Sequence, residues 1–184
     1  AVSGGALTLL QTQTASSSST IDFTSNIDST YDVYMFKFIN CHPSHSSSVF
    51  FEFQADTGTN TNYNQTITST HFRDAHDESD SAANLNYATD RDQAQGTGFQ
   101  SLAYNVGTAN DESISGTLTI YQPSSSTFVK HFLARANVYY QGGSYSMDSF
   151  TAGYFNTTTA LTRFRFKMST GNIDSGTIKL YGIS

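Results

Sequence analysis

Residues 33–39 carry the sequence Val33-Tyr34-Met35-Phe36-Lys37-Phe38-Ile39. Side chains along a β-strand point alternately to its two faces, so every second residue shares a face. The aromatic residues Tyr34, Phe36 and Phe38 therefore share one face, while the opposite face is mixed. This alternation predicts a half-buried strand with an aromatic inner side.

The same alternation recurs along the chain and predicts an all-β protein. Strands are also expected at 7–14 and 20–24, with a weaker one at 65–72, which gives about 9–10 strands. Loop-like segments at 42–48, 122–126 and 170–176 predict three hairpins between neighbouring strands. We expect one domain over 1–184, an antiparallel β-sandwich of the jelly-roll type. The main alternating sets are Val49/Phe51/Phe53, Leu118/Ile120, Phe164/Phe166/Met168 and Ile178/Leu180.

Composition narrows the possible functions and partners. The net charge of −6 argues against a nucleic-acid partner, because phosphate binding requires clustered Lys and Arg. No run of about 18 apolar residues occurs, so no membrane insertion is expected. The single cysteine, Cys41, excludes an internal disulfide and is expected to be a small buried strand residue. The chain begins at Ala1, so a processed start and a lost leader both stay open.

The stretch 71–100 differs from its surroundings because it is polar, acidic and poor in apolar residues. It is expected to form a polar insertion or long loop, with a short helical turn near 89–94. Long excursions of this kind often contact a partner, but a solvated loop explains the composition equally well.

One cluster in this stretch could support metal or acid–base chemistry. Imidazole and carboxylate groups close together can bind a divalent cation or transfer protons. Their spacing matches no known metal motif, so a solvated acidic loop is the favoured interpretation and no cofactor is predicted. The candidate metal ligands are His71, Asp74, His76 and Asp77, with Glu78 and Asp80 nearby.

Four tyrosines form a candidate binding surface around the Gly142-Gly143 turn. Tyrosine presents a flat apolar ring with a polar tip, which suits a glycan or a neighbouring subunit. The alternative is that these rings pack in the core and their hydroxyls reach the rim. The four are Tyr139, Tyr140, Tyr145 and Tyr154.

A search for catalytic motifs favours a protein that is not an enzyme. The sequence contains no nucleophile elbow, phosphate-binding loop or metalloprotease motif. A glycan hydrolase or lyase would need two positioned carboxylates in a cleft. The acidic residues instead concentrate in one polar stretch or stand singly in turns. A structural protein and a glycan-binding module are the two classes that remain favoured.

A family resemblance is carried by the segments 13–24, 27–32, 36–40, His42-Pro43, 62–64 and 171–183. These segments resemble virion structural proteins of tailed phages, especially marine and cyanobacterial ones. The resemblance implies a capsid decoration or a tail or fibre knob on the virion surface, assembled in the host cytoplasm. Its implied partners are other virion proteins and further copies, with a trimer expected. A glycan or receptor site at a fibre tip is the alternative, and no functional residue is carried over.

Overall fold

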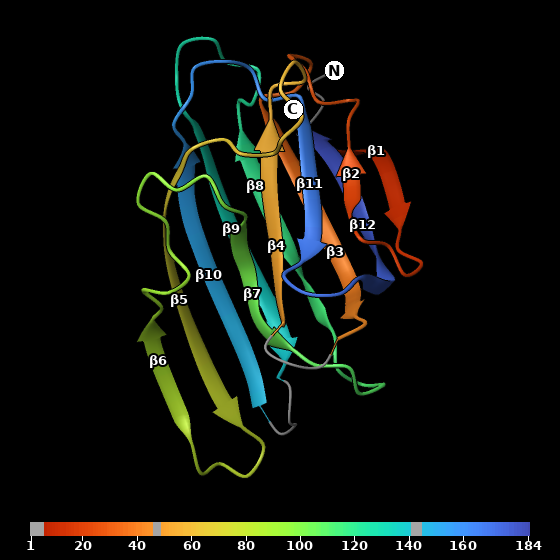
Figure 1. The fold of residues 1–184 in the computed structure, drawn as a ribbon, viewed down its shortest axis with the longest axis vertical. Coiled ribbons are helices and arrows are strands. Elements are labelled where there is room, and N and C mark those ends of the chain that lie inside the picture. The colour runs from red at the N-terminus through yellow and green to blue at the C-terminus, as the bar shows by residue number, and fades with distance from the viewer. Residues whose placement is uncertain (1–5, 46–48, 141–144) are drawn as a thin grey trace.

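The computed structural model describes residues 6–45, 49–140 and 145–184, and these residues form β-strands and no helix (Figure 1). Twelve strands are present within these described residues. They are β1 (Leu7–Thr14), β2 (Ile21–Phe23), β3 (Val33–Pro43), β4 (Val49–Asp56), β5 (Ile67–Asp77), β6 (Ala83–Tyr87), β7 (Gln100–Val106), β8 (Ile114–Tyr121), β9 (Lys130–Tyr139), β10 (Tyr145–Phe155), β11 (Arg163–Met168) and β12 (Ile173–Ile183).

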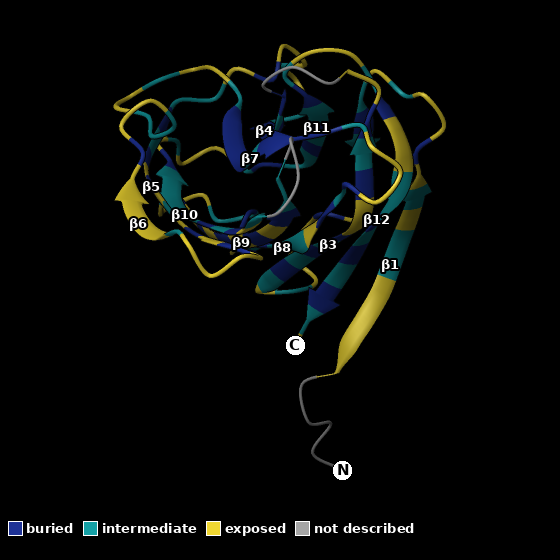
Figure 2. Cartoon of the chain, turned by 90° about the horizontal axis from the view of Figure 1, so that it is seen from below, coloured by how far each residue is buried: buried dark blue, intermediate teal, exposed yellow. Residues whose placement is uncertain are grey.

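The strands form two antiparallel sheets of unequal size. The large sheet has eight strands in the order β1-β12-β3-β8-β9-β10-β5-β6, and the small sheet has four in the order β2-β11-β4-β7. Figure 2 shows the large sheet curving around the small one, which lies on its concave side. This arrangement confirms the predicted all-β antiparallel sandwich.

Eight of the strands follow the order of a jelly roll. Strands β1-β12-β3-β8 lie in one sheet and β2-β11-β4-β7 in the other. Along these eight strands the chain changes sheet at every step except from β4 to β7, which pair within the small sheet. Two further pairs, β5–β6 and β9–β10, are inserted and widen the large sheet on one side only. The strands that the sequence did not indicate are β6, β7 and β10, which is why twelve strands are found where about 9–10 were expected.

Two of the three predicted hairpins are wrong. Strand β3 pairs with β8 and β12, whereas β4 pairs with β7 and β11 in the other sheet. Strands β11 and β12 are likewise in different sheets, and only the predicted β8–β9 hairpin is confirmed. Alternation shows that a strand has one buried face, but it does not say which strand lies beside it.

The predicted long loop over 71–100 is also corrected. Strand β5 continues to Asp77 and β6 follows at Ala83–Tyr87, so within this stretch only the turn 78–82 and the segment 88–99 lie outside strands. Near 89–94, where a short helical turn was expected, the chain makes a single turn. In it the Arg91 N–H donates to the Ala88 carbonyl at 3.0 Å. The strand expected at 65–72 is present, but its continuation to Asp77 was missed because the buried face of β5 carries Ser69, His71 and Asp77, which hide the apolar alternation.

The core between the sheets is built mainly from phenylalanine. Phe166 on β11 is fully buried, and its ring lies 5.1 Å from that of Phe36 on the opposite sheet. Within the small sheet its ring is stacked on Phe51 at 5.8 Å and on Phe53 at 6.3 Å. The aromatic alternation at 33–39 therefore predicted the buried face of β3 correctly, since Tyr34, Phe36 and Phe38 are all buried.

Replacing Phe166 with Ala should lower the free energy of unfolding by about 3 to 5 kcal/mol, because it opens a cavity at the centre of these rings. Phe128→Ala is the matched control, since that ring is 67% exposed and its loss should cost little. Urea unfolding followed by circular dichroism measures both. Equal losses for the two variants would show that the Phe166 cluster is not the centre of stability.

Candidate functional site

The four candidate metal ligands all lie on β5, but they do not face one another. The alternating burial of β5 places His71 and Asp77 on the inner face of the large sheet. Asp74 and His76 point to the outer face. Residues on opposite faces of a strand cannot share one ion. No group of three or more metal-ligating side chains is found within residues 6–45, 49–140 and 145–184.

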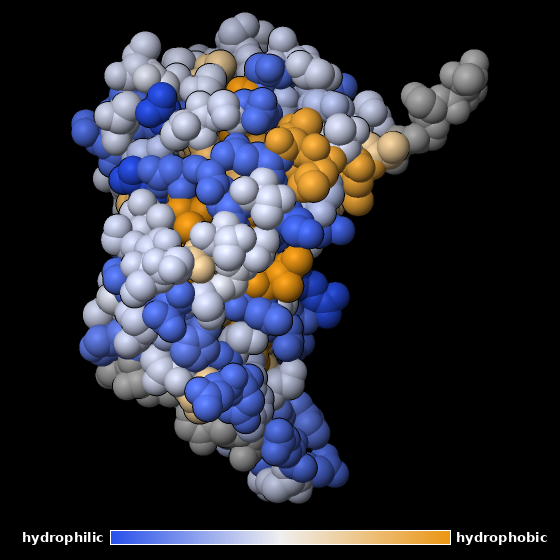
Figure 3. Space-filling model, turned by 90° about the vertical axis from the view of Figure 1, so that its right-hand side faces the viewer, coloured by the Kyte–Doolittle hydropathy of each residue, from blue (hydrophilic) through white to orange (hydrophobic). Residues whose placement is uncertain are grey.

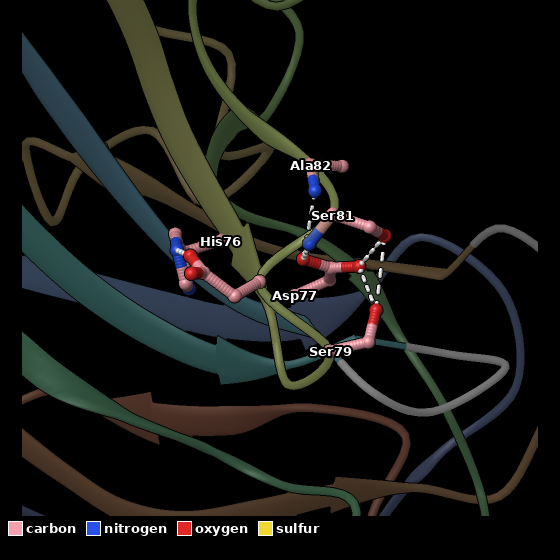
Figure 4. Close-up of polar contacts among 6 residues, drawn as sticks. His76, Asp77, Ser79, Ser81 and Ala82 are labelled. Carbon is pink, nitrogen blue, oxygen red and sulfur yellow. Dashed lines mark hydrogen bonds and ion pairs between the residues drawn. The ribbon is translucent and has the colours of Figure 1, made fainter.

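Asp77 closes the turn between β5 and β6 (Figure 4). Its carboxylate accepts hydrogen bonds from Ser79 Oγ at 2.6 Å and from the backbone N–H groups of Ser81 and Ala82 at 2.8 Å each. The Ser81 hydroxyl also donates to it. Hydrogen bonds from Ser79 and Ser81 hold the pKa of Asp77 well below its usual range. Asp77 therefore acts as a turn cap.

His71 is fully buried between the sheets, and its Nδ1 lies 2.9 Å from Thr151 Oγ1 on β10. Burial, with the positive charges of Arg73 and Arg91, lowers the pKa of His71 to about 4. The imidazole is therefore neutral at physiological pH. His76 is exposed and pairs with Asp80, with 3.2 Å between Nε2 and Oδ1.

The four candidate tyrosines separate into different places. Tyr145 is opposite Asp77 in the sheet, whereas Tyr154 is opposite Thr68, about 30 Å away at the usual strand rise. Alternation also places Tyr139 and Tyr154 on the outer face, while Tyr145 faces inward. Tyr140 and Tyr145 come together, with ring centroids 5.8 Å apart. The Gly142-Gly143 turn lies outside the described residues.

Tyr140 and Tyr145 line a hollow of about 450 Å³, which we call the tyrosine groove. It lies on the inner face of β5, β6 and β10 beside the edge of the small sheet, where Tyr104 of β7 forms its other wall. The Arg73 guanidinium lies 3.6 Å from the centre of the Tyr104 ring. The remaining lining residues are Ala75, Asn84, Asn86 and Met147.

The groove exists because the large sheet is wider than the small one. Strands β5 and β6 extend beyond β7, so their inner face is not fully covered by the second sheet. Tyr104, Arg73, Asn84 and Asn86 were not predicted from the sequence. Only the topology brings these strands together, and no local pattern signals it.

The lining residues are of the kinds found in ligand-binding pockets. Aromatic rings provide flat apolar contact, and amide and guanidinium groups provide hydrogen bonds, as in many ligand pockets. The lining residues include no carboxylate. The groove itself therefore lacks the pair of acids that glycoside hydrolysis requires.

Comparison with known proteins identifies no family. No family model matches the chain, and no curated protein matches it. A solved structure from Bacteroides ovatus, a structural-genomics protein of unknown function, is similar with 6% identity and a TM-score of 0.30. The match covers 58% of this chain and 45% of that protein. A likeness at this level carries no argument about fold or function.

In the part of the chain that the structure describes, no helix is long and apolar enough to span a membrane.

His71 should make stability depend on pH. Its pKa is about 4 when folded and near 6.5 when unfolded, so the unfolded chain binds the proton more tightly. The stability contributed by neutral His71 is complete above about pH 6.5 and is lost as the pH falls towards 4. The loss should reach about 3 kcal/mol. Urea unfolding across this range measures it.

His71→Gln should flatten this slope, whatever its effect on stability at neutral pH. His76→Gln is the control, because that imidazole is exposed and the slope should be unchanged. If the slopes of His71→Gln and wild type coincide, burial of His71 does not govern the acid sensitivity.

Proposed function

We propose that this chain is a non-enzymatic structural protein on the surface of a tailed-phage virion. The observation that carries the proposal is the jelly-roll strand order, a fold used by viral capsid proteins and by lectins. The segments that resemble phage virion proteins support the same assignment. A compact domain of this kind suits a capsid decoration or a knob on a tail or fibre.

The outer face of the large sheet supports a role in assembly. Apolar side chains stand exposed across it, among them Phe72, Tyr121 and Leu133. Phe72 of β5 is stacked on Phe150 of β10 at 4.7 Å, which gives this face a flat aromatic surface. Exposed apolar surface on a folded domain marks a contact with another macromolecule. The neighbouring proteins of a virion are the partners we propose.

Antibodies against the purified chain should label intact virions in immunogold electron microscopy. Labelling of the head would assign a decoration protein, and labelling of the tail a knob. The control is the same antibody after absorption with the chain. Detection of the chain in infected-cell lysate together with its absence from purified particles would disprove the proposal.

A second function, glycan binding, is favoured by the tyrosine groove. Tyr104, Tyr140 and Tyr145 offer rings for the apolar faces of sugars. Asn84 and Asn86 offer amide donors and acceptors for sugar hydroxyls, and Arg73 adds a cation. A glycan bound here would make the domain a receptor-binding module of the virion.

A glycan array should identify a ligand for the wild-type protein, and Tyr140→Ala should weaken that binding at least about 10-fold by removing one ring wall. Tyr154→Ala is the matched control, because Tyr154 lies at the far end of β10 on the opposite face. An equal loss in both variants, or no glycan bound by wild type, would argue against the groove as a glycan site.

A further inference from the structure

Strand β6 forms an open edge of the large sheet. It pairs with β5 on one side, and among the described residues it has no strand on the other. All of its residues, Ala83–Tyr87, are exposed, with Leu85 at 70% and Tyr87 at 53%. The sequence Ala-Asn-Leu-Asn-Tyr contains no charge and no proline. Such an edge presents unpaired backbone groups to other strands.

The direction of these backbone groups follows from the bonds at the two ends of the strand. The Asp77 N–H donates to the Ala82 carbonyl at 3.1 Å, and the Ala88 N–H donates to the His71 carbonyl at 2.9 Å. Hydrogen-bonded pairs alternate along an antiparallel ladder, so Asn84 and Asn86 also direct their backbone towards β5. Ala83, Leu85 and Tyr87 therefore direct their N–H and C=O groups outward from the sheet.

The two edges of the small sheet are protected. Strand β2 has three residues, and its Asp22 forms a bidentate ion pair with Arg165 at 2.6 and 2.7 Å. Strand β7 is irregular in register against β4, and the Arg73 side chain covers Tyr104 there. Short strands, charges and irregular pairing all discourage contact between edges.

The far edge of the large sheet is interrupted. Strand β1 contains a bulge between Leu9 and Gln11 where it pairs with β12. Bulges twist an edge and break the regular spacing of its backbone groups. Figure 3 views the molecule from this side, where apolar patches are separated by polar residues. Of the four described sheet edges, β6 is the regular and uncharged one.

We propose that two copies of this chain associate through β6, pairing antiparallel about a two-fold axis at Leu85. In this register Leu85 lies opposite Leu85 of the second copy, and Ala83 lies opposite Tyr87. These are the residues with outward backbone groups, so each pair exchanges both N–H···O bonds. The edge is complementary to itself, which is the condition for a two-fold interface.

The side chains fit this pairing. Ala83, Leu85 and Tyr87 share the outer face, where Phe72 lies opposite Tyr87 on β5 and extends the apolar strip. The nearest acidic residue on this face of β5 is Asp74, opposite Leu85. Three strand spacings would separate the two Asp74 residues, about 14 Å, which exceeds the Debye length at physiological salt. Repulsion between the two Asp74 residues is therefore weak.

A two-fold pair differs from the trimer that the phage resemblance implies. The pairing rests on the geometry of β6, and it stands or falls independently of the proposed location on a virion.

Analytical ultracentrifugation from about 10 to about 500 µM tests the proposal on the full chain. Wild type should show a monomer–dimer equilibrium, and Leu85→Pro should raise its dissociation constant at least about 10-fold. Proline at this position removes an N–H that points away from β5, so the domain should remain folded. Leu133→Lys changes an exposed residue of the same face away from the edge and should still dimerise.

Disulfide trapping provides a second measurement. In the proposed register the Leu85 Cα atoms are about 5.5 Å apart, within the range of a disulfide. Leu85→Cys should therefore form a covalent dimer with oxidised glutathione, and Leu133→Cys should not. The native Cys41 does not interfere, because burial raises its pKa to about 12. Monomer at every concentration, a trimer, or a dimer unaffected by Leu85→Pro would each overturn the proposal.

Discussion

The structure depends on the layer of phenylalanine rings between its two sheets. Only 37% of the residues are hydrophobic and tryptophan is absent, so the apolar area that holds the sandwich together comes largely from these rings. Phe166 contacts Phe36 across the interior and Phe51 and Phe53 within its own sheet. Edge-to-face and stacked contacts both occur, and they fix how the sheets sit on each other. The strand order determines which rings can meet.

The inserted strands make the large sheet wider than the small one, and polar residues cover part of the extra width. Two fully buried glutamines, Gln54 and Gln100, form hydrogen bonds to the segment 88–99. Gln54 Nε2 donates to the Gly98 carbonyl at 2.9 Å, and Gln100 Nε2 donates to the Arg91 carbonyl at 2.9 Å. The Arg91 guanidinium lies 3.6 Å from the centre of the Phe50 ring. A polar segment can therefore be well packed, which is why its composition was misleading.

The sequence predicts most of the fold and little of the candidate site, for one physical reason. Alternation reports the faces of a strand, so the buried side of β3 and the sandwich class could be predicted. Strand partners depend on long-range topology, and the β3–β4 and β11–β12 hairpins were therefore wrong. The groove combines Arg73 of β5, Tyr104 of β7 and Tyr140, which follows the end of β9, and these positions are distant in sequence. Of these residues, only Tyr140 belonged to a recognisable local cluster.

Strand β6 would connect binding with assembly, because its inner face contributes to the groove and its edge to the proposed dimer. Its inward residues Asn84 and Asn86 line the tyrosine groove, while its outward backbone groups form the open edge. Pairing through that edge would not block the groove, because the groove lies on the inner face and the shared bonds lie in the plane of the sheet. Two grooves would then stand on either side of one axis. A repeated surface glycan could engage both at once, and its avidity would exceed the affinity of either site.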